Sequence, residues 1–79
     1  MTGLLDVLVL CPQRLIFQGK TADLVLPGEK GFLEVLHYHK RLLSRLLPGV
    51  LVIEGRRIPI RRGVVKVGLN RVTLLVEEP

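Results

Sequence analysis

The stretch from Leu24 to Leu33 has the sequence LVLPGEKGFL. An apolar run of strand type leads into Pro27-Gly28, two charged residues and a second glycine follow, and apolar residues then resume. Proline fixes φ and cannot donate a backbone hydrogen bond, glycine tolerates positive φ, and charged side chains favour water. The stretch therefore predicts two strands that hold out a solvent-exposed tip around Glu29 and Lys30. Such a tip suits docking on a partner better than catalysis.

The composition favours a small β-domain. The chain has 79 residues, of which 48% are hydrophobic, with no Trp, one Tyr and two Phe. Leu, Val and Ile must therefore fill the interior, and branched aliphatic residues pack well in strands. A chain of this length forms one domain, residues 1–79, with a thin core that buries about 60% of the unfolded surface.

Charge and cysteine content limit the setting of the protein. Cys11 is the only cysteine, which excludes an internal disulfide and indicates a reducing compartment. Because no apolar run approaches the ~20 residues that span a bilayer, we expect a soluble, cytoplasmic protein. The formal net charge of +5 suggests an anionic partner, which leaves nucleic acid, an acidic protein surface and anionic lipid open.

Turn residues recur every ~8–12 residues, the spacing typical of a sandwich or barrel of short strands. We expect strands at residues 4–10, 14–18, 20–26, 31–36, 50–53, 56–60, 64–67 and 71–76. Glu54-Gly55 and the loop 68–70 predict hairpins, and Pro59 confines its strand to a sheet edge. Leucines between Lys40 and Pro48 have a helical spacing, but the segment is short, so helix and strand both remain open.

No catalytic set emerges from the chain. A hydrolase needs a nucleophile with a base or paired carboxylates, but Ser44 lies among leucines and the acidic residues are scattered. His37 and His39 could contribute to a metal site, yet the sequence places no third ligand near them, and a solvated loop or a partner contact explains them better. We therefore expect no enzyme activity, no metal and no cofactor.

Four arginines cluster around a short apolar segment; they are Arg56, Arg57, Arg61 and Arg62. They could contact phosphates, as in small β-barrels that bind RNA. Alternatively, they are the charged outward positions of a hairpin and protect a sheet edge from aggregation. No aromatic residue lies inside the cluster to stack on bases. A free-standing basic β-domain that binds RNA or another polyanion is thus the alternative function.

Short motifs along the chain are more specific in their order than any one of them is alone. They are LDV at 5–7, CP at 11–12, FQG at 17–19, DLVLPGEKG at 23–31, His39 before LL at 42–43, LPGVL at 47–51, GVVKV at 63–67 and NRVT at 70–73. In this order the chain resembles, over nearly its whole length, the N-terminal β-sandwich domain of the epsilon subunit of F-type ATP synthase, the subunit called delta in mitochondria.

The resemblance implies an all-β fold, a flattened sandwich of about ten short, mostly antiparallel strands. It also implies a non-catalytic subunit of the central stalk (rotor), peripheral on the cytoplasmic face of the energy-coupling membrane. Such a subunit binds the gamma subunit and the c-ring, couples ion-driven rotation to ATP synthesis, and has no direct nucleic-acid partner. Family contacts with gamma map onto Cys11, His39 and Ser44. The tip that faces the c-ring maps onto Gly31, Phe32 and Leu33.

The sequence departs from the family pattern in three places. Residues 37–41 read HYHKR where the family usually has Pro-Gly-His-Ala-Pro, so a rigid turn becomes a basic, more mobile loop that puts the gamma contact at His39 in question. Phe32 replaces the usual acidic or polar residue of the tip with an apolar one. The chain ends at Pro79, where most relatives continue into a helical hairpin that carries inhibition of ATP hydrolysis and, in some members, nucleotide binding; we expect neither activity here.

Overall fold

Every secondary-structure element that the structure describes is a β-strand. The computed structural model describes residues 4–28, 31–36 and 41–79, with the backbone alone for residue 23 and residues 31–36. The described strands are β1 (Leu5–Cys11), β2 (Arg14–Thr21), β3 (Asp23–Gly28), β4 (Gly31–Leu36), β5 (Leu42–Leu46), β6 (Gly49–Ile53), β7 (Arg56–Ile60), β8 (Arg62–Val67) and β9 (Arg71–Glu77). The predicted all-β class is confirmed, and the nine strands of the described residues are compatible with the expected ten or so.

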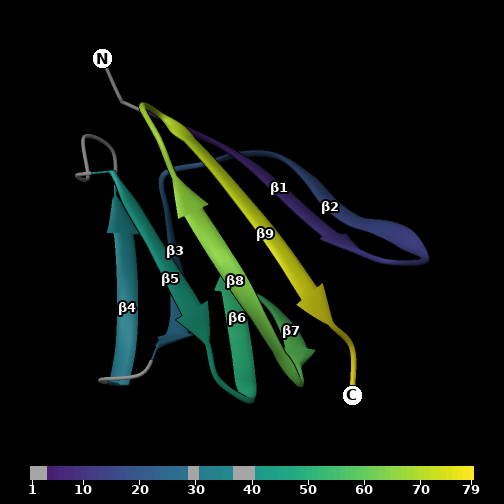
Figure 1. Ribbon diagram of the computed structural model, residues 1–79. Helices are drawn as coiled ribbons and strands as arrows, with labels where there is room; N and C mark the ends of the chain where they lie inside the picture. Colours follow the sequence, from purple (N-terminus) through teal and green to yellow (C-terminus); the bar gives the residue numbers. More distant parts are fainter. Residues whose placement is uncertain (1–3, 29–30, 37–40) are drawn as a thin grey trace.

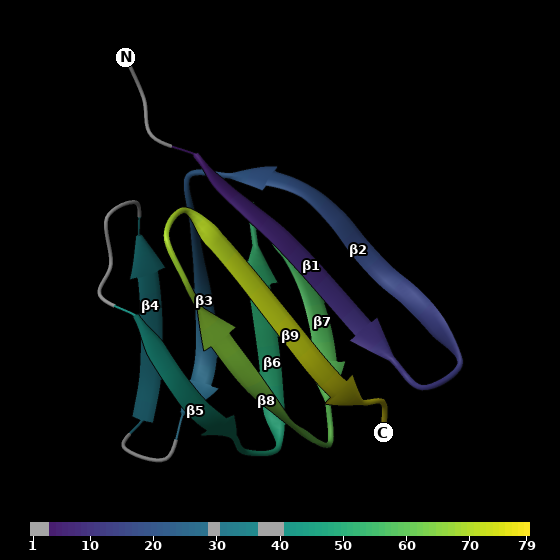
Figure 2. The same cartoon turned by 45° about the horizontal axis from the view of Figure 1, so that its top comes forward.

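The strands form two layers (Figures 1 and 2). One layer has the strand order β2-β1-β9-β8-β5, and the other has the order β4-β3-β6-β7. The layers meet at one corner, where Gly28 of β3 pairs with Leu46 of β5 and the Leu47 N–H donates a 2.9 Å hydrogen bond to the Pro27 carbonyl. Neighbouring strands are antiparallel except β1 and β9, which run parallel. The predicted sandwich is therefore a single sheet folded over on itself.

Aliphatic side chains fill the space between the layers. Side chains alternate across a strand, and in β1 the residues Leu5, Val7 and Val9 are buried while Asp6 is exposed. The other buried aliphatic residues are Leu46, Val65, Val67, Val72, Leu74 and Val76 from the first layer, and Leu24, Leu26, Leu51, Ile53 and Ile60 from the second. Burying such side chains contributes about 1.5–3 kcal/mol each relative to exposure in water, so this core is the main source of stability.

Local turn chemistry places the two predicted hairpins correctly. Glu54 and Gly55 both have positive φ (48° and 81°), as the two-residue turn between twisted strands requires. The loop between β8 and β9 ends with Asn70 at φ 56°, and the Gly68 N–H closes it with a 2.8 Å hydrogen bond to the Arg71 carbonyl. Pro59 lies on β7, which is the last strand of its layer, so its predicted edge position is confirmed.

The boundary between the second and third strands differs most from the sequence-based expectation. Gly19 does not end the second strand, because it pairs with Val7 and the strand continues to Thr21. A Cβ at Gly19 would lie 3.2 Å from Cζ of Phe17, so the glycine makes room for the ring rather than for a turn. The third strand accordingly starts at Asp23. The leucine-rich segment after Lys40 is β5, because pairing with β8 over residues 42–46 prevails over the helical spacing.

Gly63 of β8 tests the close packing of this sheet. An ideal Cβ there would lie 2.5 Å from the carbonyl oxygen of Leu75 and 2.9 Å from Cγ1 of Val76, and a backbone oxygen cannot rotate away. We expect Gly63→Ala to lower the free energy of unfolding, measured in urea, by about 1–3 kcal/mol.

Gly68→Ala is the matched control. A Cβ at Gly68 would have its nearest contact at 3.8 Å, and the change restricts the unfolded chain equally. Its free energy of unfolding should stay within about 0.5 kcal/mol of the parent. Equal stability of the two variants would show that the β8–β9 packing is looser than described.

Candidate docking site

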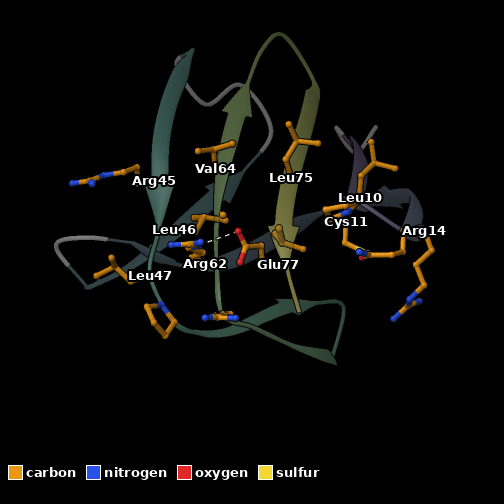
Figure 3. A pocket seen from close by; sticks show the side chains of 16 residues that line it. Leu10, Cys11, Arg14, Arg45, Leu46, Leu47, Arg62, Val64, Leu75 and Glu77 are labelled. Atoms are coloured by element: carbon orange, nitrogen blue, oxygen red, sulfur yellow. Dashed lines mark hydrogen bonds and ion pairs between the residues drawn. The ribbon is translucent and has the colours of Figure 1, made fainter. Parts of the chain in front are cut away.

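An open groove lies on the outer face of the layer that contains β1, β9, β8 and β5. Its volume is about 1170 Å³. Residues of β8 and β9 form its floor, the end of β1 and the turn to β2 form one side, and the end of β5 with Leu47 and Pro48 forms the other (Figure 3). The groove therefore spans strands that are far apart in the sequence but adjacent in the sheet.

A continuous row of apolar side chains crosses this face. Leu15 of β2 pairs with Leu10 of β1, Leu10 pairs with Leu75 of β9, and Leu75 pairs with Val64 of β8. Directly opposed residues share a face of the sheet, so the four side chains are neighbours. Leu15, Leu75 and Val64 are 49%, 52% and 39% exposed, respectively. Single exposed leucines are ordinary, but a contiguous apolar patch indicates an interaction site. We call these four residues the apolar row.

Cationic side chains border the apolar row. Arg45 of β5 pairs with Val64 and continues the row at one end, where it is exposed. Arg61 lines the groove between the end of β7 and the start of β8, and its N–H donates a 2.7 Å hydrogen bond to the Glu77 carbonyl, which ties its backbone to β9. Its side chain is exposed to solvent.

Two further arginines are held by carboxylates. Nε of Arg62 lies 3.0 Å from Oε2 of Glu77 on the facing strand, as the dashed line in Figure 3 shows. Arg14 donates a hydrogen bond to Glu78, and this bond, followed by the attraction of the negative charge, raises the pKa of the Arg14 guanidinium above its ordinary value. Since both pairs are solvent-exposed, they orient the side chains more than they stabilise the fold. With four arginines and two glutamates, the border of the groove is net positive.

Cys11 lies at the edge of the groove with its thiol turned inward. It is buried at the end of β1, and its S–H donates a weak hydrogen bond of 3.6 Å to Oε1 of Glu78. A gamma contact through Cys11 itself would therefore involve its backbone and its exposed neighbours rather than the sulfur. The contact remains a prediction.

Ser44 lies on the other face of its sheet. It pairs with Val65, whose side chain is in the core, so the serine points toward the space between the layers and its hydroxyl donates a 3.3 Å hydrogen bond to the Arg45 carbonyl. β9 and β8 separate it from Cys11, so the structure does not bring these two predicted contacts together. His39, the third, lies outside the described residues.

The predicted c-ring contacts lie at the start of β4. The backbone of Gly31, Phe32 and Leu33 pairs with residues 26–28 of β3, as expected for the two arms of a tip. The side chains of these three residues and the whole of residues 29–30 lie outside what the structure describes. The exposure of Phe32 therefore remains a prediction.

The arginine cluster of the sequence is divided in the structure. Arg56 and Arg57 begin β7, whereas Arg61 and Arg62 follow its end, and the three strand residues between the pairs put Arg57 and Arg61 about 13 Å apart along the chain. The guanidinium carbon of Arg56 lies 5.4 Å from the centre of the Phe17 ring, in cation–π geometry. The two arginine pairs therefore lie at opposite ends of β7.

The apolar row was not predicted from the sequence, although a signal for it exists. Strands with one wet face alternate apolar and polar residues, but Leu74-Leu75 and Val64-Val65 are consecutive apolar pairs. In each pair the first or second member must face outward. Such breaks in alternation on adjacent strands could have indicated an apolar outer face.

The described residues contain no group of three or more His, Cys, Asp or Glu side chains that could hold a metal ion. Across the same parts of the chain, no helix is long and apolar enough to span a membrane.

Comparison with known proteins identifies a single family. Residues 4–78 match the family model described as the β-sandwich domain of the ATP synthase delta/epsilon chain. The chain is similar to the ATP synthase epsilon chain of a Nitratiruptor species, with 45% identity over 74 residues that cover 87% of this chain and 57% of that protein.

Solved structures with the same fold include chains of two mitochondrial ATP synthases. A chain in the OSCP/F1/c-ring structure of the Euglena gracilis mitochondrial enzyme has a TM-score of 0.87 and 21% identity, over 99% of this chain and 53% of that one. A chain in the central stalk and c-ring of the Tetrahymena thermophila mitochondrial enzyme has a TM-score of 0.80 and 16% identity, over 94% and 63%. At these identities the likeness shows the fold alone. The chain spans little more than half the length of its relatives.

Thiol labelling tests whether position 11 is buried and position 75 is exposed at the groove. Cys11 is buried whereas Leu75 is 52% exposed, so in the folded protein a cysteine at position 75 should react at least about tenfold faster than Cys11 with a neutral disulfide reagent. The comparison uses the parent chain and the variant Leu75→Cys with Cys11→Ser. In denaturant the two rates should converge. Equal rates in the native protein would contradict the described burial.

Proposed function

Because the chain belongs to the ATP synthase delta/epsilon family through its β-sandwich domain, we propose that it is a non-catalytic rotor subunit of the central stalk of F-type ATP synthase. In this role it binds the gamma subunit and the c-ring and couples ion-driven rotation to ATP synthesis. It is peripheral, on the cytoplasmic face of the energy-coupling membrane, and associates with that membrane through the complex. The observation that carries the proposal is the family match over residues 4–78, with relatives named as epsilon chains.

The architecture suits a mechanical joint. Both layers share one aliphatic core and are continuous through the corner at Gly28 and Leu46, so a force on one face reaches the other without a hinge between separate bodies. Close-packed interiors have low compressibility and transmit strain. A subunit that couples two rotating partners needs this stiffness more than it needs a reactive group.

The gamma subunit contacts the face that carries the groove near Cys11 and reaches Ser44 at the edge of the sheet, and His39 remains the third predicted contact. Cys11 borders the groove directly. Ser44 lies on β5, the outer strand of its layer, where a partner that covers the groove can also reach the edge of the sheet. An exposed apolar row with a polar border is the arrangement found in protein–protein interfaces.

The c-ring contacts the end of the molecule at the β3–β4 tip, through Gly31, Phe32 and Leu33. Leu47 and Pro48 are exposed at the same end and extend the surface beside Pro27. An apolar residue at position 32 makes this contact depend on burial of hydrophobic surface rather than on charge.

Titration with the gamma subunit encoded by the same genome tests the proposal. We expect the full chain to form a complex that survives size-exclusion chromatography, with a dissociation constant in the micromolar range or tighter, because the groove presents a contiguous apolar surface. A folded chain that ignores its cognate gamma subunit at tens of micromolar would remove the proposal.

Phe32→Ser tests the c-ring contact separately. Loss of the apolar side chain should weaken binding of the gamma complex to the purified c-ring by about tenfold, with gamma binding unchanged. The control is Leu69→Ser, since Leu69 is 72% exposed in the β8–β9 loop at the opposite end of the molecule (Figure 1). Ring binding that responds equally to both changes, or to neither, would argue against a contact at Phe32.

A further inference from the structure

We infer that the groove binds an apolar segment of the gamma subunit that is flanked by carboxylates, and that Arg61 and Leu75 determine this specificity. The inference rests on the proposed function, because gamma is its named partner. It goes further by assigning the chemistry of the bound segment and the residues of this chain that select it.

The register of four strands brings the apolar side chains of the groove together. The apolar row runs from Leu15 to Val64 across β2, β1, β9 and β8, which at the ordinary strand spacing is about 14 Å. Leu75 lies at its centre and is 52% exposed. A stripe of apolar side chains on the partner covers such a row along its length. Leu75 has the largest exposed fraction in the row, so covering it removes the most apolar surface from water.

Arginine side chains at the border of the same groove supply its positive charge. The structure gives the Arg61 side chain no ion pair among the described residues, whereas Arg62 is held by Glu77 and Arg14 by Glu78. Arg45 has a further interaction within the molecule, so Arg61 is the better candidate for pairing with a partner. Its backbone bond to Glu77 fixes where the side chain leaves the sheet. A carboxylate beside the partner's apolar stripe reaches this position.

Other occupants fit the groove less well. RNA favours stacking on aromatic rings between cations, and none of the described residues that line the groove is aromatic. A second copy of the chain would place the same net-positive border against itself, since a two-fold interface apposes identical surfaces. An acidic and apolar protein segment satisfies both halves of the surface, and the net charge of +5 attracts it from a distance.

Two matched pairs of variants test the inference in gamma titrations. Arg61→Glu is compared with Arg57→Glu, which makes the same charge change at an exposed site on β7 of the other layer. Leu75→Ser is compared with Leu69→Ser, which changes an exposed leucine outside the groove. Thermal unfolding of each variant confirms that it is folded.

We expect Arg61→Glu and Leu75→Ser each to weaken gamma binding by about tenfold, and the two controls to stay within about twofold of the parent. Raising the salt concentration should weaken binding of the parent more than binding of Arg61→Glu, because only the parent loses an attractive pair to screening.

The outcomes separate this inference from the proposed function. If gamma binds the parent and all four variants equally, the subunit assignment stands and the groove assignment is overturned. If gamma does not bind the parent, both fall. If poly(U) RNA binds the parent, loses affinity on Arg61→Glu, and gamma binding is unchanged by that substitution, the groove belongs to a polyanion and the inference is wrong.

Discussion

The fold depends on burial of branched aliphatic side chains between two layers of strands. The chain has one cysteine and no Trp, so neither an internal disulfide nor a large indole contributes to the core. Leu74, Leu51 and Ile53 are completely buried, and they come from both layers. Because a small domain buries a limited fraction of its surface, nearly every inward position must be aliphatic. Close contacts such as that of Gly63 with the Leu75 carbonyl follow from this demand for tight packing.

The alternation of side chains across each strand explains why apolar residues on the outer face indicate an interaction surface. A sandwich needs only its inward positions to be apolar, so outward positions are free to be charged, as Asp6 and Lys66 are. Leu75 and Val64 break this pattern on adjacent strands. They contribute nothing to the shared core, and exposed apolar rows carry a cost in solubility. Their presence is most simply explained by a partner that covers them, which links the packing rule to the docking face.

What could be predicted from the sequence was local. Glu54-Gly55, the loop 68–70 and Pro59 each act through backbone conformation within a few residues, so the hairpins and the edge strand were correctly placed. The parallel pairing of β1 with β9 joins residues at opposite ends of the chain, and no local signal encodes it. The candidate site was harder to predict for the same reason. The apolar row can be recognised only when the register of four strands is known. The arginine cluster is continuous in the sequence, but residues of β7 separate its two pairs in the structure. Cys11 and Ser44 were predicted as gamma contacts from the resemblance alone. The face of the sheet to which each side chain points decides what it can contact, and the sequence does not show this.

The groove lies close to the β3–β4 tip, so only a few residues connect the two proposed contact sites. Leu47 lines the groove, and its N–H donates to the carbonyl of Pro27, on the strand that leads into the tip. Gly49, two residues later, has no room for a side chain because a Cβ there would lie 2.8 Å from Cβ of Pro27. In the proposed role, a load applied by gamma at the groove would reach the c-ring end through directly bonded and closely packed residues. A flexible linker between the two contacts would bend under load and transmit less of the rotation. At the corner of Gly28 and Leu46 the two layers are instead joined by direct backbone pairing.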